Sequence, residues 1–220
     1  MTHVATNMPD YESAYNNDRL DVPEFFNFGL DVVDKWAEDR TKLALISVDS
    51  TGENVQHHSF WDLKILSNKY ANALRDRGVK KGDRVFIMLP RIPEWYVVML
   101  GLIKLGALPM PGTTLLTSKD IEYRINTAEA VMAITDGENA DKIDEAAGGC
   151  PTLQHLVVVG AGRKGWVSFE EEMAEASSVL EDPEPTRSDD PLLIYFTSGT
   201  CLLYTSDAAD ERSSVDLGGR

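Results

Sequence analysis

A short run of small hydroxyl residues is the part of the sequence best suited to chemistry. The apolar segment Leu192–Phe196 leads directly into Thr197, Ser198, Gly199 and Thr200. Glycine permits backbone angles that other residues avoid and presents no side chain, so such a loop can bring backbone N–H groups and hydroxyls close to an anion. The pattern indicates a phosphate-binding loop, and an ordinary β-turn is the alternative that these residues leave open.

Two further segments follow predicted strands. Arg91 lies just beyond a buried strand, at the end where open α/β sheets bind ligands, and Gly112–Thr114 follows the next strand and could line a pocket. An exposed structural arginine and a plain turn are the alternatives. Trp95 and Tyr96 lie in an apolar helix and are predicted to belong to the core.

The remaining candidate functional residues fit structural roles better than catalytic ones. His57 and His58 are adjacent in a predicted hairpin, so their side chains point to opposite faces and do not act together. Cys150 has no spacing to His155 that implies a catalytic pair, so we expect an unreactive thiol. The stretch Glu181–Pro191 mixes five acidic residues with three prolines and predicts a surface connection. No metal site is predicted.

The elements that would position these residues alternate between strands and helices, as in a largely parallel sheet with crossover helices. The first two predicted strands form a hairpin and the others the sheet: Leu43–Val48, Asn54–His57, Arg84–Leu89, Ala107–Met110, Val131–Thr135, Leu156–Val159 and Leu192–Phe196. Helices are predicted at Asp21–Arg40, Ser59–Gly78, Glu94–Leu105, Thr117–Ala128 and Ser168–Glu175. The fold class is α/β: a three-layer lobe with a mainly parallel sheet.

With these elements in order, the chain resembles the AMP-forming acyl-CoA synthetases of the adenylate-forming superfamily. YFTSGT resembles the opening of their phosphate loop, and GVKKGDRVFIMLPRIPEWYVVMLGLIKLGALPMPGTT resembles their early sheet region. FFNFGLDVVDKWAE and MPGTTLLTSKDIEYRI resemble the medium-chain branch. The likeness runs from about Phe25 to Thr200, so the chain resembles the incomplete N-terminal part of such an enzyme.

The resemblance implies a two-step ligase reaction. A carboxylate attacks the α-phosphorus of ATP to give an acyl-adenylate and pyrophosphate, and the thiol of coenzyme A then displaces AMP. By the resemblance, Thr197, Ser198, Gly199 and Thr200 hold the ATP phosphates, which Mg²⁺ neutralises. The implied partners are a small carboxylic acid, ATP and coenzyme A, and the acid is a medium-chain fatty acid.

The chain also departs from the family pattern. After Thr200 the family continues with glycine, proline and lysine, whereas this chain reads Cys201-Leu202-Leu203-Tyr204. The later region with the catalytic lysine has no counterpart here, so no catalytic residue is named. We expect the 220-residue chain to be inactive by itself.

Three regions follow from this reading. Residues 1–20 are predicted to form a loose arm, and residues 21–200 the N-terminal part of an AMP-binding synthetase domain. Residues 201–220, CLLYTSDAADERSSVDLGGR, resemble the translation of a sequencing adapter and are predicted to be a non-native tail.

The composition narrows the class of protein. The chain has 36 acidic and 21 basic residues, a net charge of −15, which argues against nucleic-acid binding because phosphates attract basic surfaces. No apolar run is long enough to span a membrane. The N-terminal residues lack the pattern of a secretory or transit signal, which predicts a cytoplasmic location.

Other functions fit parts of this pattern. An aryl-acid–CoA ligase or the adenylation domain of a peptide synthetase would share the phosphate loop. A non-catalytic α/β interaction module, whose acidic surface binds a basic partner, is the alternative from a different class.

Overall fold

Five parallel strands form the central sheet of this computed structural model, which describes residues 21–196. Their order across the sheet is β4-β3-β5-β6-β7. The register places Val85 of β3 beside Pro109 of β4 and beside Met132 of β5. The bounds are β3 Arg84–Met88, β4 Leu108–Pro111, β5 Met132–Asp136, β6 His155–Val159 and β7 Val167–Ser168.

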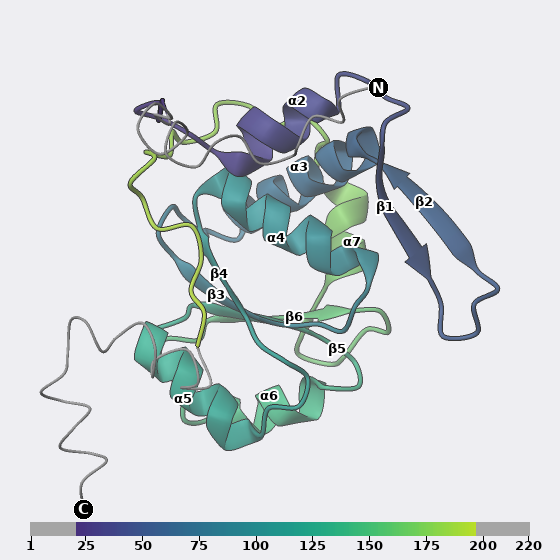
Figure 1. The fold of residues 1–220 in the computed structure, drawn as a ribbon. Helices are drawn as coiled ribbons and strands as arrows, with labels where there is room; N and C mark the ends of the chain where they lie inside the picture. Colours follow the sequence, from purple (N-terminus) through teal and green to yellow (C-terminus); the bar gives the residue numbers. More distant parts are fainter. Residues whose placement is uncertain (1–20, 197–220) are drawn as a thin grey trace, which may run out of the picture.

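Helices cover both faces of this sheet (Figure 1). One face carries α3 (Phe60–Asp76), α4 (Pro93–Leu105) and α7 (Phe169–Glu175), and the other carries α5 (Ser118–Ala128) and α6 (Ala140–Ala147). Successive strand residues point to opposite faces, which explains the near-continuous apolar strands. Each face buries its own apolar cluster, so the predicted three-layer α/β lobe is confirmed.

Local signals in the sequence fix several helix ends. Ser59 accepts a hydrogen bond from the N–H of Asp62, whose carboxylate in turn accepts from Ser59, so α3 begins with a capping box. Pro93 occupies the first turn of α4, where its missing N–H costs nothing. Gly106 ends α4 at φ +72°, a left-handed conformation that favours glycine. These ends agree with the sequence prediction.

The N-terminal helix is shorter than predicted. Instead of Asp21–Arg40, the structure has a π-helical turn η1 (Phe28–Val33) followed by α2 (Asp34–Trp36). The residues before η1 are extended because they bond to a distant segment: the Phe26 N–H donates to the Thr186 carbonyl, and the Ser188 N–H donates to the Glu24 carbonyl, both at 3.0 Å. Long-range pairing therefore replaces the first turns of the predicted helix.

A buried lysine joins the N-terminal elements to the helical layer. Lys104 of α4 is fully buried, and its Nζ donates to Asp34 Oδ1 at 2.6 Å and to Asn68 Oδ1 at 2.7 Å. Burial lowers the pKa of Lys104, and the bond to Asp34 opposes that shift. The apolar sequence around Lys104 predicted a buried helix but gave no indication of this ion pair.

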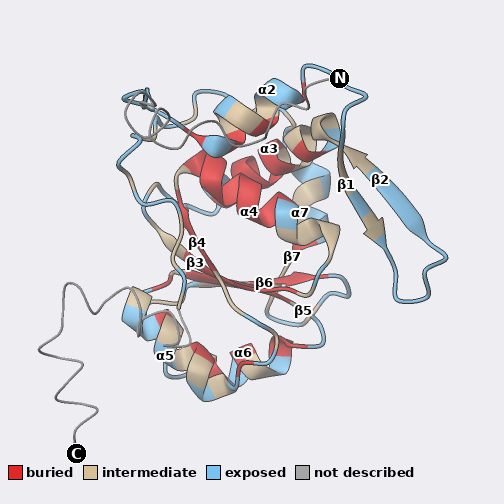
Figure 2. Ribbon diagram, in the orientation of Figure 1, coloured by how far each residue is buried: buried red, intermediate tan, exposed pale blue. Residues whose placement is uncertain are grey.

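The hairpin stands beside the sheet. Strands β1 (Leu43–Val48) and β2 (Val55–Ser59) pair antiparallel, and Figure 1 shows them projecting from the helical layer. Figure 2 shows β2 exposed along most of its length. The hairpin prediction is confirmed.

The turn of this hairpin contains an acid whose titration can be followed. Bonds from Thr51 and then Asn54 lower the pKa of Asp49 to about 2; Thr51 Oγ1 donates to Asp49 Oδ1 at 2.7 Å. A lowered carboxyl pKa stabilises the turn above pH about 4 and loses that contribution as the pH falls toward 2. We expect an NMR titration of the Asp49 carboxyl to give about 2 and to move upward in Thr51→Val. An Asp49 pKa near 4 in both proteins would contradict this.

Two elements were absent from the sequence prediction. Helix α6 is only eight residues long and its buried side chains are Ala140, Ile143 and Ala146, so its apolar face is small. Strand β7 has two residues and is recognised by its pairing with β6, which sequence periodicity does not show.

Candidate nucleotide-binding edge

The last described segment runs alongside the edge strand β4. Leu192 lines a cavity together with Gly106, just before β4, and the Ile194 N–H donates to the Pro109 carbonyl at 3.0 Å. Phe196 contacts Tyr123 of α5, the helix that follows β4. The segment therefore runs in the same direction as β4, and Phe196 lies at the carboxyl edge of the sheet, where open α/β folds bind ligands.

The predicted strand at Leu192–Phe196 is not formed, and the prolines of β4 explain why. The N–H groups of Leu108 and Gly112 donate to carbonyls of β3 and its approach, so residues 109 and 111 face the outer edge. Both are prolines and have no N–H to donate. The outer edge of β4 therefore offers carbonyl acceptors but no N–H donors at these two residues. The last segment forms one hydrogen bond with it, from the Ile194 N–H to the Pro109 carbonyl, instead of a full strand ladder.

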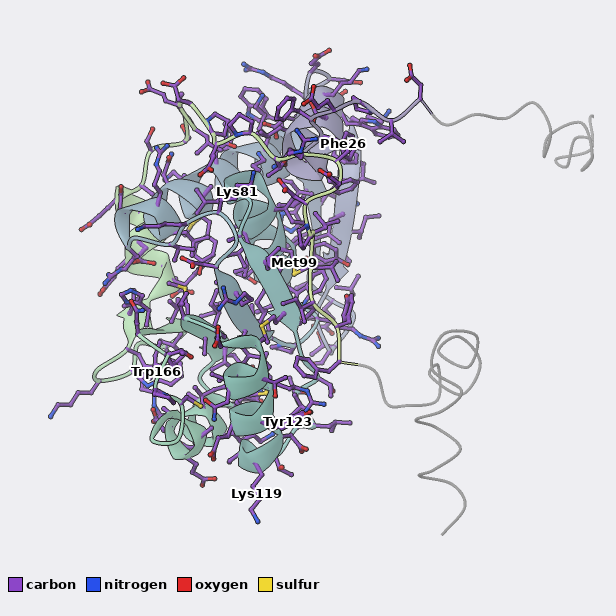
Figure 3. The ribbon with its side chains drawn as sticks, turned by 90° about the vertical axis from the view of Figure 1, so that its left-hand side faces the viewer. Phe26, Lys81, Met99, Lys119, Tyr123 and Trp166 are labelled. Atoms are coloured by element: carbon purple, nitrogen blue, oxygen red, sulfur yellow. The ribbon has the colours of Figure 1, made fainter. Side chains whose placement is uncertain are left out.

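Side chains of α5 hold the end of this segment. The ring centroids of Tyr123 and Phe196 lie 6.2 Å apart, edge to face, and the guanidinium of Arg124 lies 5.3 Å from the Phe196 ring. Figure 3 shows Tyr123 on α5. Phe196 and Ile194 also pack against the apolar cluster between the sheet and α5. These contacts fix the residue that immediately precedes the predicted phosphate loop.

The four predicted loop residues, Thr197, Ser198, Gly199 and Thr200, lie outside the described residues. Their assignment to a phosphate loop rests on residue types and on resemblance. The structure supports it indirectly by placing Phe196 at the carboxyl edge.

The neighbouring loop at this edge is fixed by a lysine of α6. Lys142 Nζ donates to the Thr114 carbonyl at 2.6 Å and to Asn139 Oδ1 at 3.2 Å. A Cβ on Gly112 would lie 2.9 Å from a methyl group of Leu116, so the loop passes close to the core. Gly112 is thus closely packed, whereas Thr113 beside it is exposed. The sequence prediction missed Lys142 because it did not include α6.

The structure agrees with most of the predictions for other single residues and contradicts one of them. Arg91 is exposed, and His57 and His58 pair with successive residues of β1, which puts them on opposite faces. Trp95 packs against the core, but Tyr96 is 43% exposed, so its predicted burial is wrong. Tyr96 lines a hollow together with residues 45–48 of β1.

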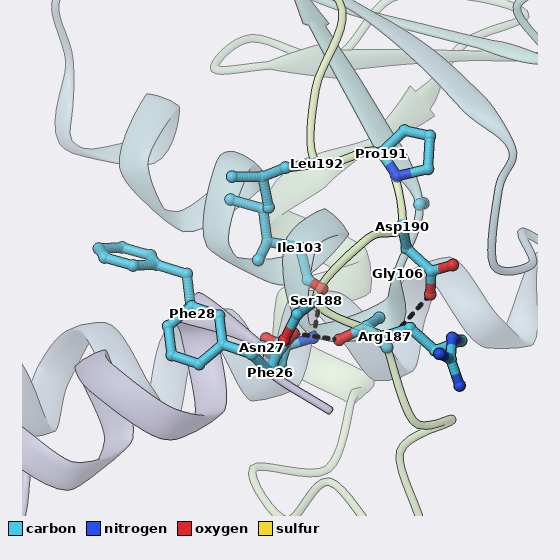
Figure 4. A pocket seen from close by; sticks show the side chains of 12 residues that line it. Phe26, Asn27, Phe28, Ile103, Gly106, Arg187, Ser188, Asp190, Pro191 and Leu192 are labelled. Carbon is cyan, nitrogen blue, oxygen red and sulfur yellow. Dashed lines mark hydrogen bonds between the residues drawn. The ribbon is translucent and has the colours of Figure 1, made fainter. Parts of the chain in front are cut away.

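The acidic connection is more constrained than a free linker. Its residues are largely exposed, as predicted, but Thr186 and Ser188 are bonded to the N-terminal segment. Figure 4 shows Asn27 beside Arg187 and Ser188. These residues line a cavity of about 120 Å³. Substrate pockets usually hold about 300–1,000 Å³, so this cavity is too small to be one.

The Cys150 thiol is buried, and we expect it to be unreactive. Its Sγ donates to the Ala146 carbonyl at 3.3 Å, and burial raises its pKa. In a Cys201→Ser background, we expect native Cys150 to react with a thiol reagent on the order of 100-fold more slowly than in guanidinium chloride. Equal native and denatured rates would contradict this assignment.

Comparison with known proteins identifies the family. Residues 33–201 match the family described as AMP-binding enzyme. The chain belongs to this family.

The relatives of this chain are acyl-CoA synthetases. ACSM3 of Mus musculus, a mitochondrial acyl-coenzyme A synthetase, is 36% identical over 207 residues, which are 90% of this chain and 35% of the relative. ACSM5 of Homo sapiens, also mitochondrial, is 40% identical over 187 residues, 81% of this chain and 32% of the relative. The chain thus spans about a third of the length of these relatives.

Solved structures agree in fold. The acyl-CoA synthetase of Brucella canis has a TM-score of 0.78 and 25% identity, covering 88% of this chain and 37% of that protein. The anthranilate CoA ligase AuaEII, solved with anthranoyl-AMP, has a TM-score of 0.72 and 25% identity, covering 81% and 33%.

The predicted cytoplasmic location is wrong, because these relatives are named as mitochondrial enzymes. The prediction used the composition of residues 1–20 alone. Within residues 21–196, every helix is too short or too polar to cross a membrane.

Proposed function

We propose that the chain is the N-terminal part of an ATP-dependent, AMP-forming acyl-CoA ligase that activates a medium-chain fatty acid. One observation carries the proposal: the segment that leads into Thr197–Thr200 runs parallel to β4 and brings Phe196 to the carboxyl edge. A loop that follows at this edge lies where parallel sheets bind nucleotides and other ligands. Membership of the AMP-binding family supports the same assignment.

In this proposal Thr197, Ser198, Gly199 and Thr200 hold the ATP phosphates through backbone N–H groups and hydroxyls. Bound Mg²⁺ neutralises phosphate charge. Coenzyme A is the acyl acceptor. A carboxylate becomes a good acylating agent once its oxygen is part of an acyl-phosphate, so the reaction depends on positioning and charge neutralisation. After Thr200 the 220-residue chain reads Cys201-Leu202-Leu203-Tyr204 where the resemblance implies a loop with a lysine, so we expect no turnover from it.

The activity can be tested on the protein expressed from its natural gene, read without interruption across codon 200. We expect exchange of labelled pyrophosphate into ATP that requires a fatty acid between butyrate and dodecanoate. Gly199→Val places a β-branched side chain in the loop and is expected to reduce exchange by on the order of 100-fold. Gly148→Val is the matched control, because it makes the same substitution at the end of α6, where nothing lies within 4 Å of the added Cβ. Equal exchange in both variants would contradict the loop assignment.

An aryl acid is the second candidate substrate. The similarity to a ligase solved with anthranoyl-AMP favours it. Benzoate and anthranilate therefore belong in the same exchange assay, and a preference for either would replace the fatty acid in the proposal.

We also propose that residues 201–220 are an adapter-derived tail, which the genomic codons at these positions test directly. By analogy with the relatives, the parent enzyme is mitochondrial. Import of the complete gene product into isolated mitochondria tests that location.

A further inference from the structure

The outer half of the β1–β2 hairpin has apolar side chains with no cover among the described residues. Its base is anchored, because Ala44 packs against a small core cluster that contains Val33 and Leu63. Toward the turn, Ile46, Val48 and Val55 are each about half exposed, 49–55%. A two-stranded hairpin by itself is only marginally stable in water, so aliphatic residues on its open face indicate a missing contact.

The free edge of β1 carries backbone groups that face away from β2. The Asp49 N–H donates to the Asn54 carbonyl at 3.2 Å, so these residues form a hydrogen-bonded pair. Opposite residues of two antiparallel strands alternate between hydrogen-bonded and non-hydrogen-bonded pairs. The rungs Val48–Val55 and Ile46–His57 are therefore non-bonded, and the N–H and C=O groups of Ile46 and Val48 point to the outer edge of β1.

A hollow borders this edge. It holds about 490 Å³ and is lined by four consecutive β1 residues, by the loop after β3, and by Trp95 and Tyr96 of α4. Residues 45–48 all line it although their side chains alternate between faces, which means that the edge of β1 faces the hollow. Arg91 lies on its rim, and within residues 21–196 no carboxylate pairs with Arg91.

We propose that a strand from the part of the synthetase that follows this lobe pairs with the free edge of β1. The chain spans 35–37% of its synthetase relatives in sequence and structure, so most of such an enzyme lies outside it. An unpaired strand edge is a template for pairing with another strand. The incoming strand places apolar side chains in the hollow and a carboxylate beside Arg91. This inference rests on family membership and is independent of the proposed acid.

Hydrogen exchange tests the pairing without any activity assay. The amides of Ile46 and Val48 should exchange quickly in the 220-residue chain. In the protein from the uninterrupted gene they should exchange on the order of 100-fold more slowly. The amide of His57 faces the opposite edge of the same rung and should exchange alike in both proteins. Unchanged exchange at Ile46 and Val48 would overturn the proposal.

Proline substitution gives a matched pair of variants. Ile46→Pro and His57→Pro each remove one outward N–H from the same rung and leave the hairpin's own bonds intact. In the 220-residue chain the two variants should change the melting temperature alike. In the complete protein Ile46→Pro should lower it more, whereas equal effects there would overturn the pairing. A second copy of the chain is the competing occupant: concentration-dependent dimers of the 220-residue chain in sedimentation, with Ile46 and Val48 already protected, would also overturn the proposal.

Discussion

Replacing Lys104 with methionine is expected to lower the free energy of unfolding by about 3 kcal/mol, because removal of one partner from a buried ion pair leaves the other uncompensated. Lys104 is fully buried, and among residues 21–196 Asp34 then keeps only Lys64, at 3.8 Å, as a charged partner. Asn68 also loses the donor that lies 2.7 Å from its Oδ1. Urea unfolding of both proteins measures the difference.

The control for this change is Lys119→Met, at an exposed position of α5, which should alter stability by less than about 0.5 kcal/mol. The double variant Asp34→Asn with Lys104→Met should recover part of the loss, since no buried charge is left unpaired. A Lys104→Met protein as stable as the control would contradict the ion-pair account.

The same pair has a predicted pH dependence. Because burial lowers the pKa of Lys104, the folded protein binds fewer protons than the unfolded chain between the folded pKa and about 10.5. Stability contributed by this group therefore rises with pH in that window and is lost as the pH falls through the folded pKa. The stability gap between the parent chain and Lys104→Met should widen toward pH about 10. A gap that stays constant would contradict the lowered pKa.

Gly101→Val is expected to cost about 3 kcal/mol, the upper part of the range for overpacked cores. Helices α3 and α4 approach closely at this glycine: a Cβ there would lie 3.1 Å from Tyr70 Cδ1 and 3.3 Å from the backbone nitrogen of Ala71. Tyr70 is fully buried and the backbone of α3 has little freedom to move. Gly137→Val is the matched control, because nothing lies within 4 Å of its added Cβ. Equal unfolding free energies for the two variants would show that the helices can separate without cost.

Local signals in the sequence predicted most of the fold because they act over a few residues. Ser59 and Gly106 mark helix ends through hydrogen bonds of their own, and Pro93 marks one because it has no N–H to donate. The buried strands are recognisable because a parallel sheet covered on both faces requires apolar residues throughout.

The errors have a different physical origin. The strand predicted at Leu192–Phe196 depends on donors from β4, and the prolines that remove them lie more than 80 residues earlier in the sequence. The residues before η1 are extended because of bonds to Thr186 and Ser188. The burial of Lys104 depends on Asp34 and Asn68, which come from two other elements. Such long-range partners leave no periodic pattern in the sequence.

The candidate site, too, has parts that the sequence predicted and parts that only the structure shows. Residue types and resemblance were sufficient to single out Thr197–Thr200, whereas the placement of Phe196 beside β4 and against Tyr123 required the structure. Lys142 was missed because its role depends on the position of α6 beside the Gly112–Thr114 turn.

The central claim, an AMP-forming acyl-CoA ligase, is tested most directly by the products of a single reaction. The complete protein from the uninterrupted gene is incubated with ATP, Mg²⁺, coenzyme A and octanoate, and the nucleotide and thioester products are quantified by mass spectrometry. The account predicts equal amounts of AMP, pyrophosphate and octanoyl-CoA. Formation of ADP and phosphate, or the absence of a thioester with every acid in the exchange assay, would contradict it.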